Sequence, residues 1–139
     1  MRKYATLNAA FPTGIQFDGA TKTKVNLFVG QVRAAAGESA AADVSTKIQE
    51  FANATVKAAW DYPDGAIIDK SYANLPASYI MHRPAEAQRA LDNLKAAADA
   101  AMSASVMWRV TERADFATLL DELERYCWKA ARIAKFVEF

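Results

Sequence analysis

The stretch from Pro84 to Glu112, PAEAQRALDNLKAAADAAMSASVMWRVTE, constrains the fold most, because it has the pattern of one long helix. Pro84 suits a first helical turn, where its fixed φ and its missing N–H cost nothing. Small residues let helices approach closely, so we expect this helix to be the centre of a bundle. Its inward stripe, at steps of three and four, is Ala87, Leu91, Leu94, Ala98, Ala101, Ser105 and Trp108.

The same spacing predicts three further helices. Gly37 separates the first two, because glycine readily adopts the left-handed conformation that ends many helices. The first helix therefore runs to about Ala36 and the second to about Trp60, and their short connection makes them antiparallel neighbours. The last helix nearly reaches the C-terminus. The predicted starts are Asp18 or Thr21 for the first helix, Ser39 or Asp43 for the second and Asp115 for the last.

Residues 1–17 show no helical stripe and contain Pro12 and Gly14, so we expect an extended arm. Aromatic side chains, among them Phe11 and Phe17, would anchor it. Two placements are open. The arm reaches a neighbouring copy of the chain, or it covers the open end of its own bundle.

Residues 61–83 form the one long connection between predicted helices, and Pro63, Gly65 and Pro76 interrupt it. A short helix can start near Asn74. Long loops that keep aromatic residues are packed lids or contact surfaces, and both interpretations are open here. The candidate interface residues of the arm and the connection are Tyr4, Phe11, Tyr62, Tyr72 and Tyr79.

The chain has 139 residues, 53% of them hydrophobic, which suffices for one compact domain and not for two. We predict an all-α fold, a four-helix bundle with an N-terminal arm and an irregular, aromatic-rich connection between helices 2 and 3. The single domain spans residues 1–139. Its parts are the arm (1–17), the first helix pair (18–60), the connection (61–83) and the long helix pair (84–139).

Composition argues against several classes of protein. The net charge is +1 with both signs interspersed, which disfavours a disordered tail and a strongly basic DNA-binding module but leaves room for a local RNA-binding patch. A single cysteine excludes an intramolecular disulfide, and the first residues show no secretory pattern, so we expect a cytoplasmic setting. No apolar run approaches the roughly 20 residues that span a bilayer, so we expect no membrane partner.

Residues that could carry chemistry are sparse. A metal site needs several His, Cys or carboxylate ligands at set spacings, and the chain has one His and one Cys, far apart. The five glycines match no phosphate-binding loop. Cys127 lies on the apolar stripe of its helix and fits a small core residue better than a nucleophile. His82, at a helix start, fits local hydrogen bonding better than general base catalysis. We therefore expect no enzymatic activity, no metal and no cofactor.

Two groups of basic residues lie beside aromatic residues, one on the last predicted helix and one around the exit of the connection. Single-stranded RNA binding uses this combination, since phosphates need positive charge and bases need flat partners. A solvated helix face also explains the first group, and the second depends on the shape of the connection. The candidate nucleic-acid-binding residues are Arg83, Arg89, Lys70, Lys129 and Arg132.

Short matches to one family follow one another between residues 18 and 80: Asn26-Leu27, Gln49-Glu50-Phe51, Trp60, Tyr62-Pro63-Asp64, Tyr72 and Leu75-Pro76. In this order they resemble the coat proteins of rod-shaped plant viruses of the tobacco mosaic type. The resemblance implies a four-helix bundle that polymerises helically in a virion and holds RNA between subunits near the inner-radius loops. Two departures stand against it. Asp61 replaces the arginine that such coats usually carry, and the second half lacks the family's loop between its long helices.

We therefore predict a non-enzymatic assembly subunit that binds copies of itself, with RNA in a basic groove as an additional hypothesis. One alternative is a helical small subunit of a ribonucleoprotein effector complex, which would bind RNA without forming filaments alone. Another is a small inhibitor or adaptor that binds one protein and no nucleic acid. The expected partners are further copies of the chain, single-stranded RNA or another protein.

Overall fold

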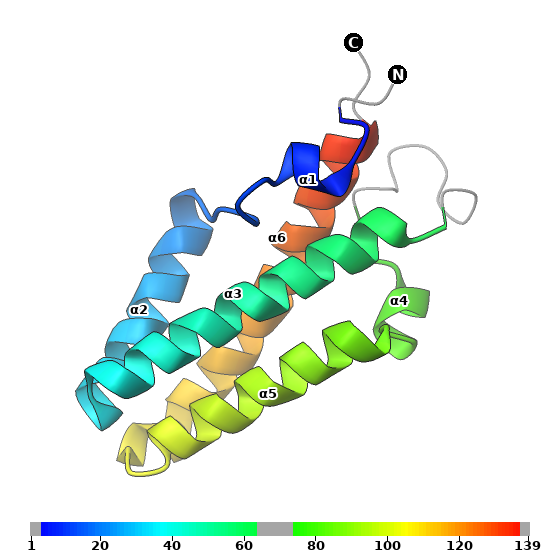
Figure 1. Ribbon diagram of the computed structural model, residues 1–139. Helices are drawn as coiled ribbons and strands as arrows, with labels where there is room; N and C mark the ends of the chain where they lie inside the picture. Colours follow the sequence, from blue (N-terminus) through cyan, green and yellow to red (C-terminus); the bar gives the residue numbers. More distant parts are fainter. Residues whose placement is uncertain (1–3, 64–73, 137–139) are drawn as a thin grey trace.

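The structure is a computed structural model that describes residues 4–63 and 74–136 (Figure 1). Within these ranges the chain is all-α and contains no strand, which confirms the predicted fold class. Lys70 and Tyr72 lie outside the described residues. The helices are α1 (Leu7–Ala10), α2 (Gly19–Ala36), α3 (Glu38–Asp61), α4 (Ala77–Met81), α5 (Ala85–Met102), the π-helical turn η3 (Trp108–Glu112) and α6 (Arg113–Phe136).

Helix α3 is the centre of the molecule, packing against α2, α5 and α6. The prediction that the helix after Pro84 is central was wrong. The inward residues of α5 form one narrow stripe, whereas α3 is buried on several sides, so that Ala52, Ala54 and Thr55 all lie inside. A helix that is apolar on more than one face suits a position surrounded by other helices.

The first helix pair forms as predicted. Gly37 ends α2 with a φ of 94°, a conformation that glycine adopts without a steric penalty, and its N–H donates to the Arg33 carbonyl at 2.9 Å. Figure 1 shows α2 running to this turn and α3 returning from it. Val25, Phe28 and Val32, which recur at steps of three and four along α2, are buried.

The long helix predicted from Pro84 to Glu112 is in fact two helices. The first ends at Met102, and a turn follows at Ser103 and Ser105. The Ser103 hydroxyl donates to the Ala100 carbonyl at 3.0 Å, an alternative that serine offers to a helical backbone. The next helix is already formed at residue 106, so the predicted cap at Asp115 was also wrong.

The turn η3 places Trp108 inside the main core. Its ring lies 5.7 Å from that of Phe116 and 6.3 Å from that of Phe28, and its Nε1 donates to Asp99 Oδ1 at 3.0 Å. The rings of Phe28 and Phe116 are stacked at 4.5 Å. Trp108 therefore belongs to the helical segment that leads into α6, and not to the end of α5.

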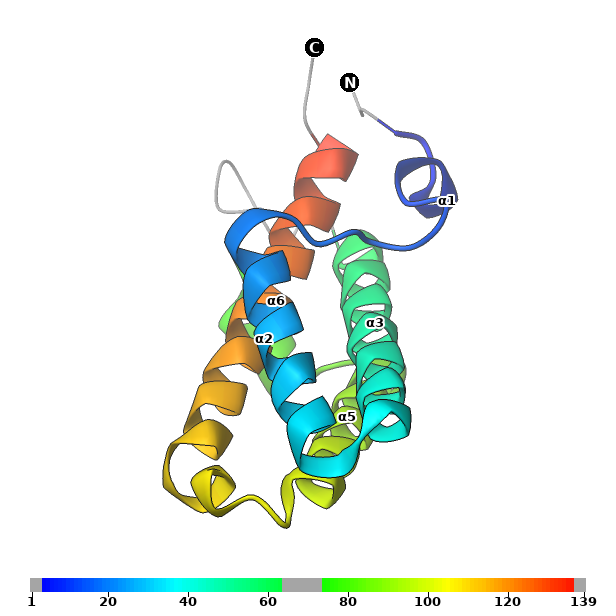
Figure 2. The same cartoon turned by 90° about the vertical axis from the view of Figure 1, so that its left-hand side faces the viewer.

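The buried residues form two clusters along the molecule. The larger joins α2, α3, α5 and the first half of α6, near the two tight turns. Figure 2 shows those turns, after α2 and after α5, at one end, with the arm and the end of α6 at the other. The smaller cluster lies at the arm end and consists of Ile15, Ala52, Val56, Ala59, Tyr79, Cys127, Trp128 and Ala131.

Candidate interaction surfaces

Arg83, which is half-buried, forms an ion pair with the buried Glu124 and does not belong to an open basic groove. Its Nε donates to Glu124 Oε2 at 2.7 Å and its Nη2 donates to Glu124 Oε1 at 2.9 Å. The Glu124 side chain is only 4% exposed. Hydrogen bonding to Glu124 raises the pKa of Arg83 above its ordinary value. The pair ties the start of α5 to α6, which is a structural role.

Arg132 is buried at 1% exposure, so its predicted place on a solvent-exposed basic face was wrong. Its Nη1 donates to the carbonyls of Ala59 at 3.0 Å and Tyr62 at 3.2 Å, and Lys135 Nζ donates to the carbonyl of Trp60. These carbonyls end α3 and have no partner within their own helix. The positive charges of Arg132 and Lys135 also interact favourably with the negative, C-terminal end of the α3 dipole. Arg132 therefore caps α3.

The remaining described candidates for nucleic-acid binding are exposed but separate. Lys129 lies on α6, next to the buried Trp128. Arg89 lies on α5 and lines a cleft of about 560 Å³ between the arm, α3 and α5, together with Glu50, Lys57 and Glu86. This lining mixes both signs of charge. The structure does not gather the described candidates into one basic groove.

The tyrosines of the connection pack inward where the structure describes them. Tyr79, on α4, is 2% exposed, and its ring lies 4.9 Å from that of Trp128. Tyr62 is half-buried, lies 5.1 Å from Trp128 and hydrogen-bonds through its hydroxyl to Ser78. The prediction of Tyr79 as an exposed interface residue was wrong. For this part of the connection the structure favours a packed lid.

The buried polar groups of Tyr79, Thr55 and Cys127 do not form a reactive site. The hydroxyls of Tyr79 and Thr55 lie close to each other and have no other hydrogen-bond partner. Burial, with a further contribution from Glu124, raises the pKa of Tyr79 to about 12. Burial also raises the pKa of Cys127, which is fully buried, well above its usual range. A cysteine reacts as a nucleophile in its thiolate form, which this burial disfavours. Cys127 is therefore a core residue, as predicted.

The arm is held by a seat that sequence reasoning missed. The N–H of Ile15 donates to Asn53 Oδ1 at 3.1 Å, and its carbonyl accepts from Gln49 Nε2 at 2.9 Å. The Tyr126 hydroxyl lies 3.0 Å from the Gln16 carbonyl. We call Gln49, Asn53 and the pocket under Ile15 the arm seat. Two amides one turn apart on α3 are too common in helices to predict it from the sequence.

The aromatic anchors of the arm are only partly covered. Tyr4 and Phe11 are half-buried, and Phe17 is half-buried with its ring 6.2 Å from that of Tyr126. The arm is not wholly extended, because α1 interrupts it, capped by the Thr6 hydroxyl that accepts from the Ala9 N–H at 3.1 Å. The arm thus covers the end of its own bundle in this structure.

Among the described residues, the large exposed apolar side chains lie at two places, apart from Leu27 on α2. Val106, Met107 and Val110 are 78%, 49% and 68% exposed at the turn between α5 and α6, and we call them the turn patch. Ile80 and Met81, on α4, are 38% and 75% exposed, and we call them the α4 patch. Neither set fits an inward helical stripe, so the sequence pattern did not single them out.

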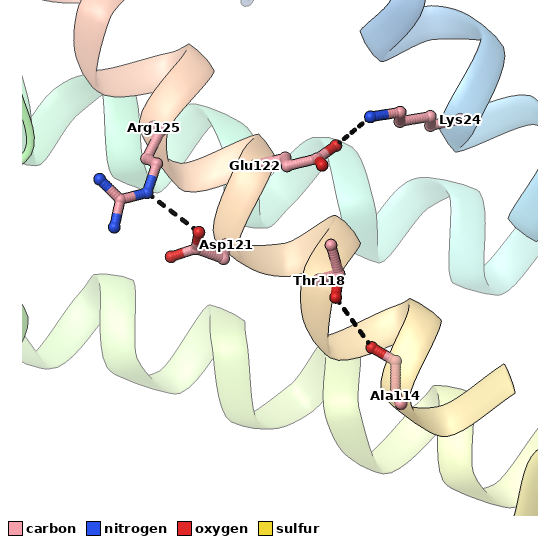
Figure 3. A network of polar contacts seen from close by, with 6 residues as sticks. All are labelled: Lys24, Ala114, Thr118, Asp121, Glu122 and Arg125. Atoms are coloured by element: carbon pink, nitrogen blue, oxygen red, sulfur yellow. Dashed lines mark hydrogen bonds and ion pairs between the residues drawn. The ribbon is translucent and has the colours of Figure 1, made fainter. Parts of the chain in front are cut away.

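A groove of about 220 Å³ separates α2 from the first half of α6. Its floor is apolar, with Phe28, Phe116 and Leu119. Figure 3 shows the Lys24–Glu122 ion pair, 2.6 Å long, crossing between the two helices. On the α6 side, Arg125 pairs with Asp121 and the Thr118 hydroxyl donates to the Ala114 carbonyl, so these polar groups are satisfied within the helix.

Neither metal sites nor membrane spans occur in the described part of the chain. Across residues 4–63 and 74–136, His, Cys, Asp and Glu form no group of three or more that could hold a metal ion. Among the same residues, no helix combines the length and the apolarity needed to cross a bilayer. Comparison with protein-family models, curated proteins and solved structures gave no match.

Proposed function

We propose that this chain is a non-enzymatic structural subunit that associates with copies of itself, with α2, α3, α5 and α6 forming a four-helix bundle as the repeating unit. The observation that carries the proposal is the pair of apolar patches. Scattered exposed apolar residues are ordinary in proteins, but grouped ones mark contact sites. Here five of the six large apolar side chains exposed among the described residues fall into two groups, and the sixth, Leu27, lies apart on α2.

The two patches lie at opposite ends of α5. The α4 patch directly precedes this helix and the turn patch directly follows it. A helix of 18 residues is roughly 27 Å long, so one patch cannot cover the other within a single chain. Each copy can therefore use one patch to contact one neighbour and the other patch to contact a second neighbour.

Joining two different patches gives a heterologous contact, which extends into an open polymer unless the rotation between copies closes a ring. The resemblance to rod-shaped virus coats points to the same kind of assembly, since helical polymerisation is what it implies. In our proposal, the turn patch of one copy packs against the α4 patch of the next.

Size-exclusion chromatography with light scattering on two blocked variants tests this arrangement. Val106→Asp/Val110→Asp blocks the turn patch and Ile80→Asp/Met81→Asp blocks the α4 patch. Each variant alone should be monomeric, because a buried unpaired carboxylate makes the contact unfavourable. An equimolar mixture should form a dimer, because each variant still carries one intact patch.

Ala20→Asp/Thr23→Asp is the matched control, since it adds the same two charges at exposed positions of α2 and should leave the oligomer intact. Far-ultraviolet circular dichroism checks that all variants keep their helices. A mixture that stays monomeric would contradict the two-patch contact. A wild-type chain that is monomeric would overturn self-association and leave the adaptor alternative.

RNA binding stays a prediction, as does the ribonucleoprotein alternative. The described candidates left on the surface are Arg89 and Lys129. Charge reversal at both should weaken retention on single-stranded RNA. It should also make retention less sensitive to salt, because two phosphate contacts are lost. The ultraviolet absorbance ratio across the wild-type oligomer peak reports whether nucleic acid copurifies. Unchanged retention would rule out RNA binding through these two residues and leave the proposal of self-association standing.

A further inference from the structure

The cleft between the arm, α3 and α5 is preformed, because each of its walls is held in place by other contacts. Its volume of about 560 Å³ lies within the roughly 300–1,000 Å³ that is typical of small-molecule sites. In the arm wall, Leu7 and Phe11 pack against the smaller cluster, and the arm seat holds the Ile15 backbone. The other walls are α3 and α5, which pack against each other.

Much of the cleft lining is apolar. The two helices present small side chains to it, Ala54 on α3 and Ala90 on α5, which leaves room beside the arm. Leu7, Phe11 and Pro12 line the arm side. Phe11 is only half-buried, so part of its ring remains open to a ligand. An apolar or aromatic group gains free energy by leaving water for such a lining.

Two side chains of opposite charge line the cleft, Glu50 from α3 and Arg89 from α5. Within the described part of the chain, neither side chain forms a hydrogen bond or an ion pair. One turn away on the same helices, Lys47 and Asp92 carry the opposite charges, but both are already bonded. Their partners are Asp43, at 2.6 Å from Lys47, and Gln88, at 2.9 Å from Asp92.

Glu86, which also lies one turn from Arg89, is near Lys57 instead. Lys57 lies two turns, about 10 Å, along α3 from Glu50 and donates to Asp61 at 2.8 Å. Hydrogen bonding to Asp61, with a smaller contribution from the charge of Glu86, raises the pKa of Lys57. These three residues form one local group of charges, so Glu50 and Arg89 remain as the charges that a ligand in the cleft can meet.

We propose that this cleft binds a small zwitterion with an apolar body, which is the chemistry shared by apolar amino acids and short apolar peptides. Arg89 binds the carboxylate, because a guanidinium can donate two parallel hydrogen bonds to one carboxylate. Glu50 accepts from the ammonium group, and the apolar body lies against Phe11 and Ala90. A ligand with a single charge meets one group of like sign, so the zwitterion is preferred. This inference goes beyond the proposed assembly and does not depend on it.

Isothermal titration calorimetry on the full-length chain tests the requirement for both charges. Phenylalanine and the dipeptide alanyl-phenylalanine carry both, whereas phenethylamine lacks the carboxylate and phenylpropionate lacks the ammonium group. We expect at least one zwitterion to bind, and both single-charge probes to bind about tenfold or more weakly. The stronger of the two zwitterions tells the free amino acid from the peptide. Equal binding of all probes, or no binding of either zwitterion, would overturn the proposal.

Two variants test the location of the site. Glu50→Gln and Arg89→Gln each remove one charge at an exposed helical position, where glutamine is a good helix former. Each should weaken binding of the zwitterion about tenfold or more. Phenethylamine should bind Arg89→Gln no more weakly than it binds wild type, because it has no carboxylate to lose a partner. Unchanged zwitterion binding in both variants would overturn the assignment of this cleft.

The matched controls are Lys22→Gln and Glu38→Gln, which remove the same charges at exposed positions outside the cleft lining. Both should bind the zwitterion as wild type does. Far-ultraviolet circular dichroism checks that all variants keep their helices. A loss of binding in the controls as large as in the cleft variants would show that the effect comes from net charge and would overturn the site.

Discussion

Arg83 and Glu124 join the start of α5 to α6 through two parallel hydrogen bonds, and the carboxylate is almost fully shielded from water. A buried pair of this kind is costly to break and not necessarily stabilising overall, because each charge loses its hydration. The two partners therefore depend on each other.

We expect Arg83→Met to lower the free energy of unfolding by about 3 kcal/mol, since Glu124 is left buried without a partner. Arg83→Met/Glu124→Met should recover most of this loss, because no unpaired charge remains. Urea unfolding followed by circular dichroism measures both. Equal losses in the single and double variants would show that the arginine acts through packing and not through the pair.

Tyr79 should make the protein lose stability at high pH. Its pKa rises from 10.0 to about 12 on folding, so this contribution is fully present below pH 10 and is lost as the pH rises to 12. The slope in this window is at most about 1.4 kcal/mol per pH unit. Tyr79→Phe should remove this slope, measured as urea midpoints at several pH values against wild type.

Tyr79→Phe should also be close to neutral at pH 7, because the hydroxyl it removes has no hydrogen-bond partner apart from the nearby Thr55 hydroxyl. Tyr126→Phe is the control, since its hydroxyl is bonded to the Gln16 carbonyl and its loss should be destabilising. A large loss in Tyr79→Phe at pH 7 would mean that the hydroxyl is satisfied in solution.

Gly14→Ala and Gly30→Ala should change stability in opposite directions. At Gly14, both the φ of 85° and the contact with Asn53 oppose a side chain, so we expect a loss of about 1–2 kcal/mol. At Gly30, inside α2, a Cβ meets nothing within 4 Å, so we expect a gain of about 0.5–1 kcal/mol. Thermal unfolding monitored by circular dichroism compares the two, and a stabilising Gly14→Ala would rule out the seat geometry.

Cys127 should be unreactive in the folded protein. Its thiol is buried among apolar residues, which raises its pKa and leaves little thiolate. A chromogenic disulfide reagent should modify it only after denaturant is added, with kinetics that follow unfolding. Fast modification of the native protein would place this thiol at the surface.

Arg132 should matter for stability far more than a neighbouring arginine of the same helix. Arg132→Met removes the donor to the Ala59 and Tyr62 carbonyls, and we expect a loss of about 2 kcal/mol. Arg125→Met breaks only an exposed pair with Asp121 and should stay within about 0.5 kcal/mol. Similar urea midpoints for both variants would contradict the capping role.

The fold was predictable where the signal is local. Gly37 and Pro84 act through their own backbone preferences, so the helix boundaries beside them were predicted within a residue or two. The break at Ser103 was missed because alanine-rich sequence runs up to it and no glycine or proline follows it. Trp108 also kept the spacing of the inward stripe, although it reaches the core from a different helix.

The surfaces were less predictable, because charge in a sequence does not reveal burial. Arg132 has the same local pattern as an exposed arginine, and its partners at the end of α3 lie about 70 residues earlier in the chain. Likewise, Gln49 and Asn53 look like ordinary solvated residues of a helix. Only the folded chain brings Ile15 to them, so the arm seat has no signature in the sequence.

The π-helical turn η3 changes which side chains of the last helical segment face the core. Residues eight apart in a regular α-helix differ by about 80° around the axis, so Trp108 and Phe116 would lie toward opposite edges of one apolar stripe there. The π-helical turn reduces this offset, as an extra residue would, and both rings contact Phe28, with Phe116 stacked on it and Trp108 tilted against it. The length of this turn therefore matters more than which residues form it. Removing a single residue would rotate the turn patch relative to the rest of α6.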